Sequence, residues 1–346
     1  MAGTSQEVRS LSGRPSEVVT IRVFYPLVSG RIALRTERDW HTDIEPTRIS
    51  EDGTCFEFEI PFERSWLYFK PVLADRGSVY WSQGNNYLVV TSSRRDREIW
   101  PHFFESLGSS KFDRLQVPIE GLPESHFVTV YHPPGYQENS LRHYPVLYMQ
   151  DGQNLFFPEE AFAGNPWRVD ETLTVMDSMN IMRRTIIVGI YPRRRMDEYT
   201  MPGYARYGRY IVDVLKPYID GTYRTMTGPE NTAVMGSSLG GVVTFYLAWQ
   251  YPEIFGMAAC MSSTFGWRDD LMERIESEAK REIRIYLDSG WPGDNYEITR
   301  GMRDLLLRRG WIAGLDLLYY AFPNAIHNEQ NWAMRSHIPF QFFFGR

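Results

Sequence analysis

The feature that most constrains the fold of this chain is a regular alternation of strand-like and helix-like segments that begins near residue 113. Eight short apolar runs have the length of strands: 113–119, 127–132, 145–150, 185–190, 232–236, 257–262, 283–288 and 315–322. Stretches with the amphipathic spacing of helices separate the later runs: 169–182, 206–219, 239–251, 269–280, 296–308 and 330–344. This alternation predicts a mostly parallel sheet covered by helices on both faces, with an antiparallel first hairpin.

The first third of the chain has a different pattern. Short alternating or apolar runs are separated by turn-rich pieces, and no helical period is present; the runs are 18–25, 31–35, 54–60, 66–73 and 87–90. This is typical of a small antiparallel β-sandwich, here of immunoglobulin-like or E-set type. A basic, polar break at 92–98 precedes the change of pattern. We therefore expect a β-sandwich domain over residues 1–110 and an α/β domain over residues 111–346.

Composition excludes some partners. Acidic and basic residues are interspersed and give a net charge of −6, so we expect no nucleic-acid partner. No apolar run approaches the ~20 residues of a membrane helix, and the N-terminus lacks a signal-peptide core. Cys55 and Cys260 fall in different predicted domains, so a structural disulfide is not expected. These features favour a cytoplasmic protein without membrane contact, and they leave a homo-oligomer open.

The strongest local signal is the G-x-S-x-G motif centred on Ser238. It lies between the apolar run 232–235 and the helical stretch that follows, which is the context of a nucleophile elbow in an α/β-hydrolase. Gly236 and Gly240 leave room for the neighbouring backbone in this strained turn. Ser238 then projects at the carboxyl end of a strand, and the amide of Leu239 is a natural donor to a developing oxyanion.

A serine nucleophile needs a histidine base, and two histidines follow Ser238. His327 comes on a loop after the last predicted strand and before the final helix, where this fold carries its base. His337 falls inside that helix, where a surface or packing role is expected. We assign His327 as the base.

Two aspartates compete for the acid. Asp288 ends the predicted strand 283–288, whereas Asp294 follows a Gly-Trp-Pro-Gly turn that can carry a carboxylate toward the histidine loop. Asp294 also precedes a helix, where an Asp commonly serves as the N-cap. We favour Asp294 over Asp288.

The loop after strand 145–150 is expected to supply the second oxyanion donor. Gly152 lets the backbone turn so that the N–H of Gln153 faces inward. Asp151 precedes the serine in sequence and is expected to brace this loop.

These motifs, with several others, resemble the putative-esterase family, which includes enterochelin esterases, esterase D and bacterial feruloyl esterases. The matching segments span about 145–335: 147–156, Trp167 with 169–171, 198–200, 215–220, 236–241, Tyr251-Pro252 with Phe255, 293–297, and 327–329 with Trp332. The resemblance implies an α/β-hydrolase sheet, carboxylic-ester substrates, and a Ser-His-Asp triad that needs no metal or cofactor, and it supports Asp294 as the acid. Some relatives of the enterochelin-esterase type carry an N-terminal β-sandwich. One departure is Asp151-Gly152, where many relatives have His-Gly.

The substrate is less constrained by the sequence. Arg193, Arg194 and Arg195 follow a strand at the edge where loops build the pocket, and they could bind an anionic acyl group. An aromatic pocket could be lined by Trp167, Tyr199, Tyr204, Tyr207, Trp291 and Trp332. We expect hydrolysis of an aromatic, siderophore-like or polyketide-type ester. An acyltransferase on the same scaffold is one alternative, and a carbohydrate-binding or scaffolding protein is another, using Trp40, Trp66, Tyr80 and Trp81.

Overall fold

The computed structural model describes residues 17–346 except 63, 94–96, 109–110 and 119–124. Three features considered in the sequence lie outside the described residues. They are the N-terminal segment that was considered as a signal peptide, the centre of the polar break at 92–98, and the last residue of the strand expected at 113–119. The chain divides into two compact units. The first runs to Phe104 and includes Gln137–Leu141, and the second comprises Glu105–Tyr136 and Arg142–Arg346.

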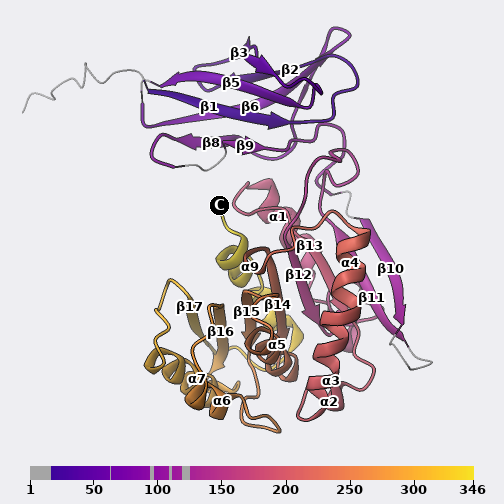
Figure 1. Cartoon of the computed structure of the whole chain (residues 1–346), viewed down its shortest axis with the longest axis vertical. Coiled ribbons are helices and arrows are strands. Elements are labelled where there is room, and N and C mark those ends of the chain that lie inside the picture. Colours follow the sequence, from indigo (N-terminus) through magenta and orange to yellow (C-terminus); the bar gives the residue numbers. More distant parts are fainter. Residues whose placement is uncertain (1–16, 63, 94–96, 109–110, 119–124) are drawn as a thin grey trace, which may run out of the picture. The chain divides into compact units, whose positions relative to one another are not determined.

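The first unit consists of two mostly antiparallel sheets whose inner faces form one core. One sheet has the order β4-β5-β1-β9, in which the short β9 pairs parallel to β1, and the other has the order β3-β2-β6-β7 with β8 also paired to β6 (Figure 1). The strands are β1 (Glu17–Phe24), β2 (Arg31–Thr36), β3 (Asp39–Ile44), β4 (Arg48–Ile49), β5 (Cys55–Phe62), β6 (Trp66–Asp75), β7 (Ser78–Trp81), β8 (Tyr87–Val90) and β9 (Glu98–Ile99).

Alternation along these strands explains the core of the first unit. Val19, Ile21 and Val23 of β1 are buried, whereas the intervening residues are more exposed, as expected for a strand with one face on a core. All five strands expected from the sequence are present. The pattern missed β3, β4, β7 and β9, because β3 is mostly polar, β7 is exposed throughout, and β4 and β9 are only two residues long.

The segment Gln137–Leu141 joins the first unit through hydrogen bonds to its backbone, although it lies far along the chain. The amide of Asn139 donates to the carbonyls of Phe24 and Pro101, each at 2.9 Å. The Glu138 carboxylate accepts the N–H groups of Phe103 and Phe104. A single cut near residue 110 therefore does not separate the two units.

The second unit contains the eight-stranded sheet expected from the sequence, in the order β10-β11-β13-β12-β14-β15-β16-β17. The first three strands pair antiparallel and the remaining neighbours pair parallel. Its strands are β10 (Lys111–Pro118), β11 (Ser125–His132), β12 (Val146–Gln150), β13 (Ile186–Ile190), β14 (Thr232–Ser237), β15 (Met257–Met261), β16 (Arg284–Trp291) and β17 (Leu317–Pro323).

The helices of the second unit cover both faces of this sheet. The α-helices are α1 (Val169–Ser178), α2 (Arg195–Glu198), α3 (Gly203–Tyr210), α4 (Lys216–Thr222), α5 (Leu239–Gln250), α6 (Leu271–Ser277), α7 (Tyr296–Arg308), α8 (Glu329–Arg335) and α9 (His337–Phe344). Short turns of helix are η1 (Gly152–Asn154), η2 (Phe162–Gly164) and η4 (Pro229–Asn231), and a π-helical turn, η3 (Ile211–Leu215), joins α3 to α4.

Two details differ from the expected helices. The stretch 206–219 is helical throughout but contains the π-helical turn η3. The expected final helix is divided at Ser336 into α8 and α9. Pro339 has no N–H to donate to the carbonyl of Arg335, so the helical ladder is interrupted there.

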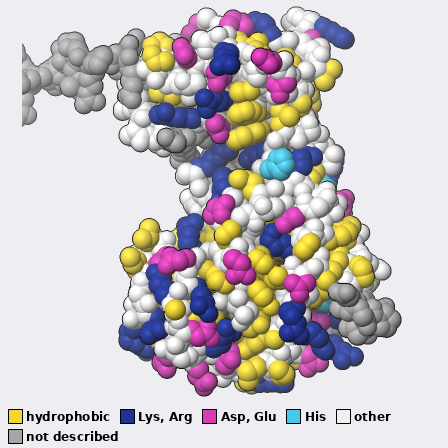
Figure 2. Space-filling model, in the orientation of Figure 1, with side chains coloured by type: hydrophobic (Ala, Val, Ile, Leu, Met, Phe, Trp, Pro, Cys, Tyr) yellow, Lys and Arg dark blue, Asp and Glu magenta, His cyan; other side chains and the backbone are white. Residues whose placement is uncertain are grey.

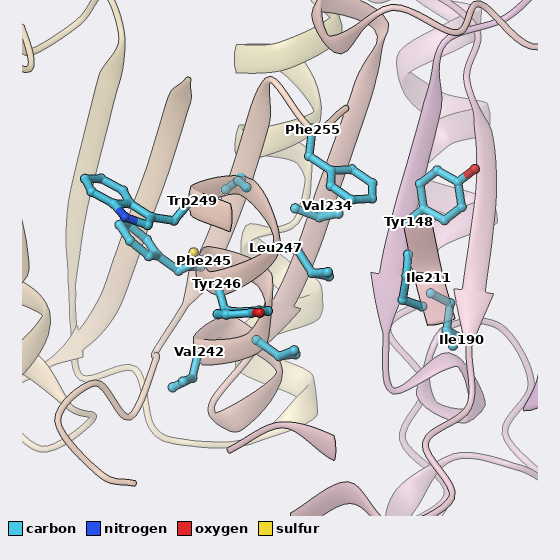
Figure 3. Packing of buried hydrophobic residues seen from close by; sticks show 14 of the residues in the cluster. Tyr148, Ile190, Ile211, Val234, Val242, Phe245, Tyr246, Leu247, Trp249 and Phe255 are labelled. Carbon is cyan, nitrogen blue, oxygen red and sulfur yellow. The ribbon is translucent and has the colours of Figure 1, made fainter. Parts of the chain in front are cut away.

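Alternate residues of the central strands belong to two separate hydrophobic cores, one on each face of the sheet. Val146 and Tyr148 of β12 join the core under α3 to α7, whereas Leu147 and Met149 join the core under α1, α8 and α9. Helix α5 is buried along almost its whole length, and Figure 3 shows its Phe245 and Leu247 within the first of these cores. A helix that is apolar on nearly every side is buried in the core of the unit rather than lying on its surface.

The surface of the molecule carries both signs of charge. In the view of Figure 2, Lys and Arg side chains are interspersed with Asp and Glu side chains on each unit. Along the described residues, no helix combines the length and the apolar character needed to cross a membrane.

Candidate active site

Ser238 lies in the sharp turn between β14 and α5, with a backbone conformation (φ 56°, ψ −122°) that L-residues seldom adopt. Its N–H donates to the carbonyl of Met261 on β15, and its own carbonyl accepts the N–H of Gly241. A Cβ at Gly236 would lie 2.5 Å from the carbonyl oxygen of Gly240, and a Cβ at Gly241 would lie 1.9 Å from Ser263 Oγ. At Gly240, the second glycine expected from the sequence, a Cβ would come no closer than 3.2 Å to Asp151 and Gln150, which is a tight contact but not a clash with backbone. The strict steric demand for glycine in this turn therefore falls on Gly236 and Gly241.

The structure brings His327 and Asp294 to Ser238. The Nε2 atom of His327 is 2.9 Å from Ser238 Oγ, and its Nδ1 atom is 2.6 Å from Asp294 Oδ1. An ionised carboxylate only accepts, so the geometry fits an imidazole that carries its proton on Nδ1 and accepts the serine proton at Nε2. The ring of Trp332 makes an edge-to-face contact with the imidazole, at 4.8 Å between ring centroids, and this contact helps to hold the imidazole in place.

Asp294 is buried and held from several directions. Its Oδ2 atom accepts the hydroxyl of Ser262 at 2.5 Å and the N–H of Gly290 at 2.8 Å. Burial by itself would raise the pKa of Asp294, but the hydrogen bonds from His327, Ser262 and Gly290 outweigh burial and hold that pKa below its ordinary value. This carboxylate therefore stays ionised beside the imidazole.

Asp288, the competing acid, faces a different set of partners. Its Oδ1 atom accepts from the guanidinium of Arg335 at 3.0 Å, and its Oδ2 atom accepts the hydroxyl of Tyr286 at 2.8 Å. It is completely buried, and this burial raises its pKa to about 6 although Arg335 opposes the shift. His337, the competing base, is exposed at the start of α9. The geometry thus brings together Ser238, His327 and Asp294.

Two backbone amides can face the oxyanion. Leu239 is the first residue of α5, and Gln153 lies in η1 after β12. Among the described residues, neither of these N–H groups has a hydrogen-bond acceptor. Both remain available to a bound carbonyl oxygen.

The loop that carries Gln153 is braced by Asp151, which adopts a left-handed conformation (φ 54°). Its N–H donates to the hydroxyl of Tyr199, and its carboxylate accepts two bonds from Arg195 at 2.7 and 2.9 Å. This agrees with the bracing role expected for Asp151. It also assigns the Arg195 guanidinium mainly to the loop rather than to a substrate.

A pocket of about 480 Å³ opens beside Ser238. Its lining consists of Ser238, Leu239, Thr264, Phe265, Trp267, Asn295 and Ile298. Phe265, Trp267 and Ile298 were not among the residues expected from the sequence. For Phe265 and Trp267 the signal was position, since residues 262–267 directly follow β15 at the carboxyl edge of the sheet, where ligands bind in open α/β folds. Ile298 comes from the first turn of α7.

The remaining residues expected to contact substrate fall into two groups. Arg193, Arg194 and Trp291 are exposed. Two tryptophans, by contrast, are buried: Trp167 packs on Trp332 in the core under α1, α8 and α9. Tyr199, Tyr204 and Tyr207 are also buried. For these five aromatic residues the expectation of a pocket-lining role needs correction, because the packing of the sheet faces turns their rings inward.

The described residues contain no group of three or more His, Cys, Asp or Glu side chains arranged to hold a metal ion.

Comparison with known proteins agrees with this architecture. The family model described as "Putative esterase" matches residues 120–332, more than half of the chain. The uncharacterised protein YbbA of Bacillus subtilis (strain 168) is 25% identical over 178 residues, covering 47% of this chain and 66% of YbbA, just under two thirds. YjcH of the same organism is 27% identical over 185 residues, covering 52% of this chain and 72% of YjcH.

Solved structures share the fold at low identity. A ferulic acid esterase from Anaeromyces mucronatus is 18% identical with a TM-score of 0.55, covering 68% of this chain and 91% of that one. The enterobactin esterase FES from Shigella flexneri is 13% identical with a TM-score of 0.53, covering 94% of this chain and 92% of that one. The fold shared with FES thus extends beyond the region of the α/β-hydrolase sheet. With the family model matched across most of the second unit, this chain belongs to the putative esterase family of α/β-hydrolases and is a carboxylic ester hydrolase.

Proposed function

We propose that this protein hydrolyses its ester through Ser238 as nucleophile, His327 as general base and Asp294 as the acid that orients the imidazole. The observation that carries the proposal is the hydrogen-bonded series from Ser238 Oγ through His327 to Asp294, at 2.9 and 2.6 Å. Both distances lie within the reach that proton transfer requires. The left-handed turn at Ser238 supports the same role, because strain of this kind is concentrated at functional sites.

The first half of the reaction forms an acyl-enzyme. Ser238 Oγ attacks the ester carbonyl while its proton moves to His327 Nε2, and the negative charge of Asp294 stabilises the imidazolium that results. The N–H groups of Leu239 and Gln153 stabilise the oxyanion of the tetrahedral intermediate. When this intermediate collapses, the bond to the alcohol breaks and His327 returns its proton to the leaving oxygen.

The second half releases the acid. A water molecule gives its proton to His327 and attacks the acyl carbon, so that a second tetrahedral intermediate forms. Its collapse breaks the bond to Ser238 Oγ, which takes back the proton from His327. The products are a carboxylic acid and the free enzyme.

The pocket beside Ser238 favours an ester with an aromatic or similarly flat apolar group. Phe265, Trp267 and Ile298 present apolar surface there, and a volume of about 480 Å³ is in the usual range for small-molecule sites. Trp267 keeps 45% of its surface exposed, so much of its ring is available to a ligand. This chemistry fits the aromatic ester expected from the sequence.

The nucleophile is tested by Ser238→Ala and by a fluorophosphonate probe. We expect the variant to lose at least three powers of ten in kcat, because only oxyanion and binding contributions remain. Mass spectrometry of the wild-type protein should locate the phosphonyl adduct on Ser238. Turnover near the wild-type rate in a folded, purified variant, or an adduct on another residue, would refute the mechanism.

The substrate class is tested by Trp267→Ala. Loss of a stacking surface should lower kcat/KM for an aromatic ester about 10- to 100-fold, while an activated acetate ester changes little. Tyr218→Ala is a matched control, because Tyr218 is a comparably exposed aromatic residue of the second unit but lies on α4, outside the lining of this pocket. Equal losses for the two esters, or equal effects of the two variants, would contradict this choice of substrate.

A further inference from the structure

The hydroxyl of Ser262, behind Asp294, has three hydrogen-bond partners. It accepts the indole N–H of Trp332 at 3.0 Å and an N–H of the Arg335 guanidinium at 2.9 Å, and it lies 2.5 Å from Asp294 Oδ2. A hydroxyl has two acceptor positions and one proton, and Trp and Arg side chains can only donate. Both acceptor positions of Ser262 Oγ are therefore filled, and its proton has the Asp294 carboxylate as its acceptor.

The backbone of Ser262 is held as firmly as its side chain. The residue follows β15 in a left-handed conformation (φ 44°) and is completely buried. Its N–H donates to the carbonyl of Asp288 at 2.8 Å, and its carbonyl accepts the side-chain amide of Asn295, the neighbour of Asp294, at 2.8 Å. A non-glycine residue keeps such a conformation only where its surroundings over-determine it.

Arg335 links this serine to both carboxylates. The guanidinium is buried, 3.0 Å from Asp288 Oδ1 and 3.8 Å from Asp294 Oδ2. The charged or titratable groups near Asp294 are thus His327 and Arg335, together with Asp288, which contacts the same guanidinium nitrogen as Asp294 does. Two carboxylates share one cation, which leaves net negative charge to balance the imidazolium that forms during catalysis.

We propose that Ser262 is a positioning residue of the esterase site, whose fixed hydroxyl proton holds Oδ2 of Asp294 so that Oδ1 faces His327 Nδ1. This role rests on the proposed function, because it acts only through the Asp294–His327 pair. Ser262 does not touch the pocket beside Ser238, so it contributes to the rate rather than to substrate binding. The hydrogen bond from Ser262 also makes the Asp294 carboxylate less basic. A less basic carboxylate stabilises the protonated imidazole less strongly.

The experiment compares Ser262→Ala and Ser262→Gly with Ser263→Ala, using an activated acetate ester over a range of pH. Ser263 is the matched control, because it is the next residue, it is buried, and its hydroxyl has no partner among the described residues. Glycine suits the left-handed conformation at position 262, so Ser262→Gly removes the hydroxyl with little backbone strain.

Both Ser262 variants should lose about tenfold in kcat with KM within about twofold of wild type, the loss expected when one charge-assisted hydrogen bond is removed. Without the donor, Asp294 is more basic and stabilises the imidazolium form of the base more strongly. The acidic limb of the kcat/KM profile should therefore move upward in pH. Ser263→Ala should keep the wild-type profile.

The proposal is overturned if the Ser262 variants match Ser263→Ala, or if kcat falls while the acidic limb stays in place. If neither Ser262 variant folds, Trp332→Phe removes one of the two donors that orient the hydroxyl, and it should move the limb in the same direction. An unchanged profile in that variant also overturns the proposal. The outcome for Ser238→Ala separates the two hypotheses. If that variant is active, the proposed function is refuted. If it is inactive and the Ser262 variants have wild-type kinetics, only the role of Ser262 is refuted.

Discussion

Replacing each candidate acid by its amide should separate catalysis from stability. In Asp294→Asn, the position of Oδ2 still receives two donors, the hydroxyl of Ser262 and the N–H of Gly290. The amide oxygen must occupy that position, and the NH₂ group then faces His327 Nδ1. The imidazole is driven to the tautomer with its proton on Nε2, which cannot accept the proton of Ser238.

The expected loss follows from that wrong tautomer. An acid-to-amide change of this kind in a Ser-His-Asp triad lowers kcat by about 10⁴, which is about 5.4 kcal/mol in the activation barrier. The fold should be retained, because the amide keeps the shape of the carboxylate and the two hydrogen bonds to its oxygen.

Asp288→Asn should instead keep most of the activity and lower the stability of the fold. The imidazole keeps its partner, so kcat should change by less than about tenfold. The guanidinium of Arg335, however, loses its ionised partner at 3.0 Å in a fully buried site. Uncompensated burial of a charge costs about 3–5 kcal/mol. Because burial already disfavours the ionised form of Asp288, the neutral amide should cost less than this, and the melting temperature should fall by less than about 6–12 °C.

The assay combines turnover of an activated acetate ester with thermal unfolding of each purified variant. Two outcomes would refute the reasoning. One is substantial activity in Asp294→Asn together with a severe loss in a folded Asp288→Asn, and the other is a stable Asp288→Asn protein with an unfolded Asp294→Asn protein.

Two further predictions concern stability. Burial raises the folded-state pKa of Asp288 to about 6 from an ordinary 3.8, so the native state binds this proton more tightly than the unfolded chain does. Its contribution to the free energy of unfolding should be largest below pH about 4 and decline as the pH rises to about 6; a difference between wild type and Asp288→Asn that is flat over this range would contradict it. Gly236→Ala should open the elbow and lower both activity and melting temperature, because the new Cβ would lie 2.5 Å from a backbone oxygen. Gly301→Ala, which meets no atom within 4 Å in the middle of α7, should instead stabilise the fold by about 0.5–1 kcal/mol, and equal effects of the two substitutions in calorimetry would refute the steric argument.

Local signals in the sequence predicted the sheet and the elbow. The eight runs of the second unit match its eight strands within a few residues. The central strands β12 to β15 are buried on both faces and are therefore continuous apolar segments, whereas the edge strands β10 and β17 are partly exposed. The G-x-S-x-G motif predicted the turn at Ser238 because steric demands on the glycines act between residues a few positions apart. In the first unit the same approach missed β3 and β7, since strands with polar or fully exposed side chains carry no alternation.

Contacts between distant residues could not be predicted in the same way. The order Ser, acid, His narrowed the candidates to four residues, but the choice of Asp294 depends on a hydrogen bond to a residue 33 positions away, and Ser238 meets His327 across 89 positions. The burial of Trp167 and Trp332 likewise follows from packing between α1, α8 and the sheet.

What the sequence by itself determined is therefore the fold class, the family, and Ser238 and His327 as the candidate nucleophile and base, because each of these depends on patterns within short segments or on their order. The tertiary structure decided which aspartate faces the histidine, which aromatic rings line the pocket, and that Ser262, Trp332 and Arg335 meet behind Asp294. Those three residues come from the end of β15 and from α8. Only the pairing of the strands and the packing of α8 against the sheet bring them within hydrogen-bond distance, and no spacing along the chain encodes that contact.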